Sequence, residues 1–299
     1  MLDYEIKPFF VTEPFKIDKL YTMFHRTHIP ANKRYAGESH DFWECIYLKD
    51  GNVCNCVDGK VYNMEKGDLI FYKPLEFHHA VENDKKADLF YFTFSLENCP
   101  EDFASDTVYK LSSNQMKIME KIIDFSMNAI KNNPFTEEEI ARQKAEYINY
   151  DYIRPLLAFG KNTTDTATVV NYIEELFLDL YNTKNVVVET DSFYAGIYRK
   201  AVSFMTEHIS EKLTTPEIAS HCNVGTTTLK KIFLKFSNLS IHKHFIKLKI
   251  NHAIILLKSG ASVNEAALRT GFSSQAYFSA AFKRETGATP RDYLKWYSD

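Results

Sequence analysis

The sequence lacks the signatures of a secreted protein, a membrane protein or a common enzyme. No apolar run approaches about 18 residues, and the N-terminal MLDYEIKPFF contains no apolar core of signal-peptide length. The sequence also contains no nucleophile elbow, no phosphate-binding glycine loop and no paired catalytic carboxylates. We therefore expect a cytoplasmic protein that is not an enzyme.

Cysteine is scarce, and its spacing offers no disulfide framework. The five cysteines are an odd number: Cys45, Cys54, Cys56, Cys99 and Cys222. Cys54 and Cys56 resemble half of a zinc site, but no second pair of Cys or His completes it. We expect reduced, mostly buried thiols and no structural zinc.

The net charge of −3 is small, but the charge is unevenly distributed along the chain. Residues 195–299 carry 15 Lys and Arg against 7 Asp and Glu, a net charge of +8. Residues 1–194 carry 21 against 32, a net charge of −11. A basic C-terminal part is typical of contact with nucleic-acid phosphates, and the length of 299 residues allows two domains.

The stretch from about 262 to 286 predicts two short helices joined by a tight turn. Ser262 and Glu265 can form a capping box, in which each side chain binds the backbone N–H of the other residue. Gly271 ends the first helix where a positive φ is needed, and Ser273 is expected to cap the second helix. This arrangement is a helix-turn-helix, the unit that places its second helix in the major groove of DNA.

An upstream copy, residues 213–237, repeats this pattern. Thr214 and Glu217 form its capping box, and the downstream copy carries one extra turn residue. Residues 240–258, between the copies, predict one long helix, which would separate the two units by about 25–30 Å at about 1.5 Å per residue. This approaches the roughly 34 Å of one DNA turn, so both second helices could enter successive major grooves.

Residues from about 196 to 299 resemble the DNA-binding domain of the AraC/XylS family of bacterial transcription regulators. The matching residues are Gly271-Phe272-Ser273, Tyr277-Phe278, Phe282-Lys283, Gly287, Thr289-Pro290 and Tyr293, with Lys249-Ile250-Asn251-His252-Ala253 and Leu256-Leu257 in the connecting helix. The resemblance implies a sequence-specific DNA-binding regulator, usually a ligand-responsive activator. It also implies double-stranded DNA and RNA polymerase as partners, a homodimer, no cofactor, and a place at the nucleoid in the bacterial cytoplasm.

Four residues depart from the family pattern. Gly225 replaces the Ser that usually caps the first recognition helix, and Asn223 replaces the turn glycine. Lys249 replaces an Arg, and Ala280 replaces a long polar side chain. Because Ala can contact only a thymine methyl group, the last change limits base reading by the second unit.

The outward faces of the two recognition helices contain the residues that we expect to contact DNA. They are Thr226, Thr227, Lys230 and Lys231 in the first unit, and Ser274, Gln275, Ala276, Ser279, Lys283 and Arg284 in the second. Gln275 suits adenine recognition, whereas Lys283 and Arg284 suit phosphate. The alternative for each residue is an ordinary solvated helix face.

Residues 1–111 predict an antiparallel β-barrel, so the expected fold class is α+β with two domains. Short runs rich in Phe, Tyr, Val and Ile are separated by turns, and Asp58-Gly59 is a strong hairpin signal. The frame of Gly67-Asp68, Pro74 and His78, preceded by His40 and Glu44, resembles the cupin-like sensor domain of many AraC-family members.

Such a barrel could enclose a small-molecule effector. The candidate contacts are the aromatic residues Trp43, Tyr47, Tyr72 and Phe92 and the polar residues His40, Glu44 and His78. Core packing is an equal alternative for each aromatic residue. Cupin enzymes hold a metal with three His and a carboxylate, but Phe42 stands where one His is expected. The remaining three side chains could form a facial triad. We nevertheless expect no metal, since these side chains can also cap or line a strand end.

Residues 112–182 predict helices that are candidates for dimerisation. The first helical pattern ends at Asn132-Asn133-Pro134, and a second helix is expected from Thr136 to about Phe159. Further on, Val169, Ile173, Leu176 and Leu180 follow a 4-3-4 spacing, typical of a short coiled-coil seam with a second chain. The alternative is packing against the barrel of the same chain. Residues 183–195 are expected to form a linker to the DNA-binding domain, residues 196–299.

Two other functions are compatible with the sequence. One is a metal-dependent cupin enzyme with an appended DNA-binding domain. The other is a regulator whose barrel binds a protein and no small ligand. Metal analysis of the purified chain would identify the first, and thermal-shift screening against metabolites would test the second.

Overall fold

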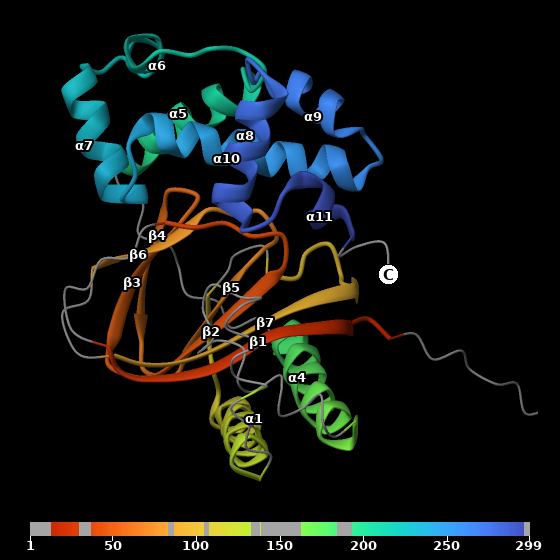
Figure 1. Ribbon diagram of the computed structural model, residues 1–299. Coiled ribbons are helices and arrows are strands. Elements are labelled where there is room, and N and C mark those ends of the chain that lie inside the picture. The colour runs from red at the N-terminus through yellow and green to blue at the C-terminus, as the bar shows by residue number, and fades with distance from the viewer. Residues whose placement is uncertain are drawn as a thin grey trace, which may run out of the picture.

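The computed structural model describes residues 13–29, 37–82, 87–104, 108–132, 138, 163–183 and 193–295. Figure 1 shows a β-sheet domain in the centre, a helical domain packed on one side of it, and two helices, α1 and α4, on the other side. The helix expected from Thr136 to about Phe159 and most of the expected linker lie outside the described residues.

Eight strands form two antiparallel sheets in the N-terminal domain. The first sheet has the order β1 (Lys16–Ile29), β7 (Ala87–Asn98), β2 (Trp43–Asp50), β5 (Asp68–Tyr72) and β8 (Val108–Lys110). The second has the order β4 (Lys60–Glu65), β3 (Asn52–Val57) and β6 (His78–Glu82). The predicted hairpin is confirmed: Asp58 and Gly59 join β3 to β4 with φ values of 44° and 81°.

The predicted closure into one barrel is not seen among the described strands. The chain leaves the first sheet at the end of β2 and enters the second sheet at β3, through Gly51 with φ of 92°. It returns from β4 to β5 through Gly67, with φ of 90°. These two glycines adopt positive φ without steric cost, so the chain can change sheets within one or two residues. The result is two facing sheets with a core between them.

The first sheet is buried on both faces, and residue parity assigns each strand residue to one of two cores. Along β2, Cys45 and Tyr47 belong to the core that α1 and α4 cover, whereas Ile46 and Leu48 belong to the core between the sheets. Helices α1 (Ser113–Asn132) and α4 (Thr163–Thr183) therefore lie outside the two-sheet core. Figure 1 shows them below the sheets, on the side opposite the helical domain.

The C-terminal domain contains seven helices among residues 193–295. They are α5 (Phe193–Glu207), α6 (Thr215–His221), α7 (Thr226–Ser237), α8 (Ile241–Lys258), α9 (Val263–Arg269), α10 (Gln275–Thr286) and α11 (Pro290–Lys295). Both predicted capping boxes are confirmed, Thr214 with Glu217 at α6 and Ser262 with Glu265 at α9. The expected cap of the second recognition helix was wrong by one residue. Ser274 caps α10 and accepts from the N–H of Tyr277, because the longer turn keeps Ser273 outside the helix.

The core of the first helix-turn-helix unit includes residues of the N-terminal domain. Cys56 of β3 is buried in the same cluster as Tyr198, Phe233 and Phe236, and Val61 of β4 packs against that cluster. At the tip of the β3–β4 hairpin, Gly59 lies so close to the Tyr198 ring that a Cβ atom there would overlap it. The two domains therefore share a continuous apolar contact.

Among the helices in the described ranges, none is both long enough and apolar enough to cross a membrane.

Candidate nucleic-acid interface and buried polar cluster

The first helix-turn-helix unit presents α7 with its predicted DNA-contacting side chains outward. Thr227, Lys230 and Lys231 are exposed and Thr226 is half-buried. The opposite face of α7 is buried in the core through Leu229, Ile232, Phe233 and Phe236. Gly225 is the N-cap and makes no side-chain hydrogen bond to the helix. The start of α7 is therefore open to a partner, without a capping side chain over its first turn.

The second unit presents α10 in a similar way. Ser274, Gln275, Ala276, Lys283 and Arg284 are exposed, and Ser279 is half-buried. Arg284 Nε already lies 2.9 Å from Glu285 Oε1, so part of its guanidinium charge is neutralised within the chain. Tyr277 is also exposed, at 42%. This exposed aromatic ring adds an apolar surface beside the predicted base-reading residues.

The turns of the two units use left-handed residues at matching places. Asn223 has φ of 56° in the first turn and Gly271 has φ of 67° in the second. After the recognition helices, Asn238 (φ 50°) and Gly287 (φ 85°) adopt the same conformation. Asn therefore takes the place of Gly at both positions of the first unit, because Asn is the residue that tolerates this region best after Gly. Gly271 has a further constraint, since a Cβ atom there would collide with the carbonyl oxygen of Ser210.

A buried lysine in α8 joins the two units. Lys249 is 4% exposed, and its Nζ donates to the carbonyl oxygens of Ile209, Glu211 (3.1 Å) and Thr270 (2.7 Å). Ile209 and Glu211 precede the first unit, whereas Thr270 is the C-cap of α9 in the second unit. Sequence analysis identified Lys249 only as a replacement for Arg. The structure shows that it bonds the segment before the first unit to the C-cap of α9 in the second.

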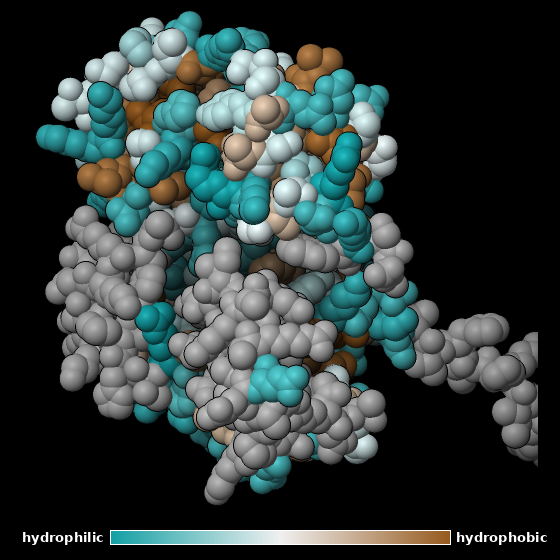
Figure 2. Space-filling model, in the orientation of Figure 1, coloured by the Kyte–Doolittle hydropathy of each residue, from teal (hydrophilic) through white to brown (hydrophobic). Residues whose placement is uncertain are grey.

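Both recognition helices begin at the end of the helical domain that is farthest from the sheets. In Figure 1, α7 on the left and α10 in the centre each run downward toward the β-sheet domain, so their N-terminal ends point away from it. Figure 2 shows mainly hydrophilic side chains on this side of the helical domain, with separate hydrophobic side chains between them. The predicted DNA-contacting residues near the helix starts are therefore not covered by the β-sheet domain.

The predicted effector residues separate into two groups. Tyr47 and Phe92 are buried in the core beneath α1 and α4, and Trp43 packs against that core. Tyr72 belongs instead to the core between the sheets. The division arises because alternate residues of a strand face opposite sides of the sheet. Tyr72 pairs with Glu44 and therefore faces the side of the sheet opposite to Tyr47.

His40, Glu44 and His78 converge into one cluster, which we call the polar cluster. Glu44 Oε2 lies 2.9 Å from His40 Nε2 and 3.4 Å from His78 Nε2. The side chains of His40, Glu44 and His78 are 16%, 14% and 4% exposed, respectively. The His78 ring stacks on Tyr72 with ring centroids 3.9 Å apart, and the His40 ring stacks on Phe42 at 4.0 Å. Each histidine is therefore held by an aromatic neighbour as well as by the carboxylate.

The polar cluster shifts the proton affinities of its members. Burial alone would raise the pKa of Glu44, but the adjacent His40 and His78 rings outweigh it and lower that pKa to about 2. Burial lowers the pKa of His78, but the Glu44 carboxylate outweighs this effect and raises it overall. Both shifts stabilise an ionised carboxylate next to positive charge.

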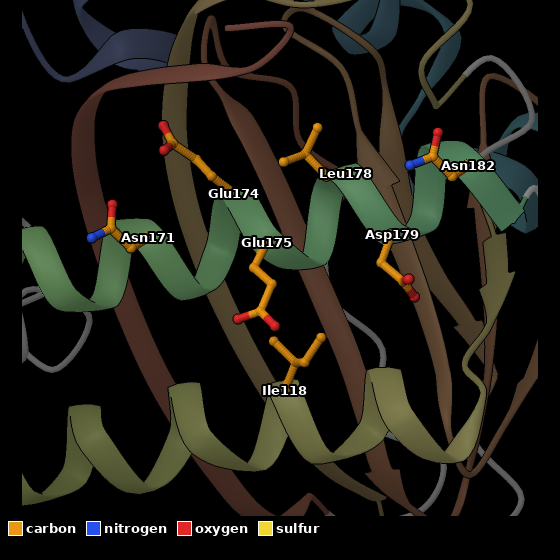
Figure 3. A pocket seen from close by; sticks show the side chains of 7 residues that line it. All are labelled: Ile118, Asn171, Glu174, Glu175, Leu178, Asp179 and Asn182. Atoms are coloured by element: carbon orange, nitrogen blue, oxygen red, sulfur yellow. The ribbon is translucent and has the colours of Figure 1, made fainter.

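The predicted dimer seam is placed in the core of its own chain. Val169, Ile173, Leu176 and Leu180 of α4 are each 0% exposed and pack with the first sheet and α1. A second chain could contact them only if α4 moved away from the sheet. The outer side of α4 forms a shallow groove with α1, in which Glu175 of α4 points toward Ile118 of α1, whereas Leu178 points away from α1 (Figure 3).

Comparison with known proteins agrees with the helix-turn-helix geometry. Residues 218–295 match the profile of a helix-turn-helix domain family. Over 277 residues the chain is 25% identical to the HTH-type transcriptional activator RhaR of an Enterobacter species, and the match covers 86% of each chain. The chain belongs to the AraC/XylS family of transcription regulators.

Two further AraC/XylS-type relatives match different lengths of the chain. Over 262 residues it is 22% identical to the activator RhaS of Mannheimia succiniciproducens, covering 86% of this chain and 88% of the relative. Over 94 residues it is 36% identical to the regulator ArgR of Pseudomonas aeruginosa, covering 31% of this chain and 29% of the relative. As a member of this family, the chain is a DNA-binding transcription regulator and not an enzyme.

Proposed function

We propose that this regulator reads two successive major grooves on one side of the duplex, with α7 in one groove and α10 in the next. The main support is that both helix-turn-helix units are attached to α8, whose 18 residues span about 27 Å at about 1.5 Å per residue. Lys249 connects the backbone just before the first unit to the C-cap of α9 in the second, which supports a fixed separation of the two units. A fixed separation close to one helical turn of DNA suits half-sites about 10 base pairs apart.

This proposal can be tested by changing the spacing of the half-sites in a DNA site selected with the full chain. Inserting five base pairs rotates one half-site to the opposite side of the duplex, and inserting ten base pairs restores the side but doubles the distance. A rigid two-unit domain should lose affinity with both insertions. Full recovery with ten base pairs would show that the units move independently and would reject the fixed separation.

We assign base reading and backbone contact to different residues. Gln275 is exposed at the start of α10, where its amide can pair with adenine, and Lys283 lies two turns later, where phosphate is the expected partner. Gln275→Ala should relax the choice of base at one position at a cost of about 1–3 kcal/mol there. Lys283→Ala should weaken binding to all sequences alike and reduce its salt dependence. Equal losses on every mismatched site for Gln275→Ala would contradict the assignment.

We also propose that the two-sheet domain senses a small molecule and that the regulator activates transcription through RNA polymerase. The buried polar cluster lies next to the core between the sheets, and the domain is in contact with α7 and α8. A ligand that prefers one arrangement of the two domains would shift the population of that arrangement. In vitro transcription from a bound promoter, with and without compounds that raise the melting temperature, tests both parts. Lower transcript levels on binding of the regulator would indicate repression.

We propose a homodimer that uses the outer faces of α1 and α4. The inner stripe of α4 is already buried, whereas Leu178 and Met127 are 40% and 43% exposed on the outside. Leu178→Asp should shift the chain toward monomer in sedimentation equilibrium, because the new charge would be desolvated at the contact. Glu175→Lys changes the charge on the same helix and tests whether polar groups contribute to the dimer contact. A wild-type chain that sediments as a monomer at all concentrations would reject the dimer.

A further inference from the structure

The segment of residues 37–42 lies between the polar cluster and the helical domain. Its alternate residues face opposite sides, as in an extended strand. Three contacts join the odd-numbered residues to the helical domain: Gly37 N–H donates to the Ser237 carbonyl oxygen (3.2 Å), Ser39 Oγ pairs with the Asn251 side chain (3.0 Å), and Asp41 pairs with Lys258 Nζ (2.6 Å). We call residues 37–42 the connecting segment.

The even-numbered residues of the connecting segment face the β-sheet domain. Glu38 exchanges two backbone hydrogen bonds with His78, of 2.9 and 3.0 Å. His40 belongs to the polar cluster through Nε2, and its carbonyl oxygen accepts from the N–H of Leu75 (2.6 Å). The same six residues therefore carry one member of the polar cluster and three contacts to the helical domain.

Apart from Ser237 of α7, the helical side of this contact is one stripe of α8. His244, Asn251 and Lys258 are seven residues apart, which returns to nearly the same face of a helix after two turns. Asn251 Nδ2 also donates to the Leu75 carbonyl oxygen (3.2 Å), and the His244 ring lies 4.5 Å from the Phe77 ring. Because α8 carries both helix-turn-helix units, any shift of the connecting segment acts directly on the DNA-reading domain.

The hydrogen bonds of the two histidines determine which ring nitrogens carry protons. His40 Nδ1 lies 2.9 Å from the Phe42 carbonyl oxygen, and His78 Nδ1 lies 3.0 Å from the Glu76 carbonyl oxygen. A carbonyl oxygen can only accept, so both Nδ1 atoms donate, and a neutral ring then has a bare lone pair at Nε2. Both Nε2 atoms lie within 3.4 Å of Glu44 Oε2, which is itself an acceptor when ionised. The cluster therefore needs either an extra proton on each ring or a cation bound by all three groups.

We propose that His40, Glu44 and His78 bind one first-row divalent transition-metal ion, and that this ion holds the connecting segment in contact with α8. This inference rests on the proposed ligand-responsive function and names the ligand class. It replaces our expectation from the sequence that no metal is bound, which rested on the missing third histidine.

The two His–Glu separations have the spacing that such an ion requires. The three donor atoms lie within 4.8 Å of one another, the two His–Glu separations being 2.9 and 3.4 Å. Ligands about 2.0–2.2 Å from a metal, at angles between about 90° and 109°, lie roughly 2.8–3.6 Å apart. His78 is 3% exposed, and its Nε2 has no hydrogen-bond partner within the described part of the chain. Both Nδ1–H groups donate to carbonyl oxygens, the second-shell arrangement that orients a metal-binding histidine.

The chemistry of the donors also predicts which ions bind. Two imidazole nitrogens and one carboxylate favour Zn²⁺, Fe²⁺ or Ni²⁺, whereas Mg²⁺ prefers oxygen ligands alone. Among the described residues this is the one group of three such side chains that could hold a metal ion. The described part of the chain therefore offers a single site, with one ion per chain as the expected stoichiometry.

The first experiment measures metal binding by the full chain. After chelator treatment and dialysis, calorimetric titration with Zn²⁺ should give one ion per chain, and titration with Mg²⁺ should give none. His40→Gln and His78→Gln should each weaken Zn²⁺ binding by at least about tenfold. His25→Gln is the matched control, because His25 pairs with Asp88 (2.9 Å) and belongs to no such group. The proposed site is wrong if the wild-type chain binds no Zn²⁺. It is also wrong if both His variants remain folded and bind Zn²⁺ as tightly as the wild type does.

The second experiment measures coupling to DNA. Removing the metal should change the affinity of the wild-type chain for its selected DNA site by at least about fivefold. Asp41→Asn with Ser39→Ala leaves the three ligands intact, so this variant should still bind one Zn²⁺ ion but lose the fivefold response. A response that persists in this variant, or no response in wild type that binds both Zn²⁺ and DNA, overturns the coupling. Zn²⁺ binding by a chain that binds no DNA would instead reject the proposed function.

Discussion

Replacing Lys249 with Met should destabilise the helical domain, because three carbonyl groups lose their common donor. Two of these acceptors, the carbonyl oxygens of Ile209 and Thr270, are buried, so water cannot replace the lost bonds. A buried acceptor without a partner costs about 1–3 kcal/mol, which gives about 2–6 kcal/mol for two. Burial of the ammonium group in the wild type offsets part of this cost, as the lowered Lys249 pKa of about 8 indicates. We therefore expect a net loss of roughly 2–4 kcal/mol.

The measurement is urea denaturation of the full chain, with the midpoint and slope compared between variants. Lys247→Met is the matched control, because Lys247 lies on the same helix and makes only a 3.6 Å ion pair with Glu285. Its loss should be no more than about 1 kcal/mol. Lys249→Arg should retain most of the stability, since a guanidinium can also donate to several carbonyls. A Lys249→Met midpoint equal to that of Lys247→Met would refute the reasoning.

Two further predictions concern α8 and the second turn. His244 is buried and its pKa is lowered to about 3, so the unfolded chain gains a proton below about pH 6.5 that the folded chain does not. Stability should therefore fall as the pH falls from about 6.5 toward 3, and His244→Gln should remove part of this slope, whereas exposed His242→Gln should not. Gly271→Ala should destabilise the chain by at least about 1 kcal/mol in thermal unfolding, because of its positive φ and the Ser210 carbonyl. Asn223→Gly should be close to neutral, and equal effects of these two substitutions would contradict the steric argument.

Local sequence signals predicted the helical domain well. The capping boxes at Thr214 and Ser262 depend on residues three apart in the sequence, so no tertiary information is needed to recognise them. Asn238 and Gly287 are also local signals, because Asn and Gly tolerate the left-handed conformation that both residues adopt. The boundary at Ser273 and Ser274 was missed because either serine can cap a helix, and only the packed length of the turn distinguishes them.

The β-sheet domain was less predictable because its arrangement depends on contacts between distant strands. Tyr47 and Tyr72 are both aromatic strand residues, yet they lie in different cores, and only the pairing of β2 with β5 reveals which face each occupies. The stripe of α4 from Val169 to Leu180 was correctly predicted as apolar. Its 4-3-4 spacing alone could not show whether a partner chain or the chain's own sheet would cover the stripe.

The contact between Asp41 and Lys258 was missed for the same reason, since these residues are far apart in the sequence. One signal was nevertheless present. His244, Asn251 and Lys258 recur at seven-residue intervals and so form one polar stripe along α8. A polar stripe of this kind can indicate a second contact surface on a helix whose other faces are already used.

The contribution of Cys56 and Val61 to the core around Tyr198 has a consequence for experiments with truncated chains. Cutting the protein at the start of α5 would expose to solvent an aromatic surface that the β3–β4 hairpin covers in the intact chain. Chimaeras that join this reading domain to the sensor of another regulator would meet the same problem. Such exchanges should succeed only when residues 52–65 are transferred together with the helices.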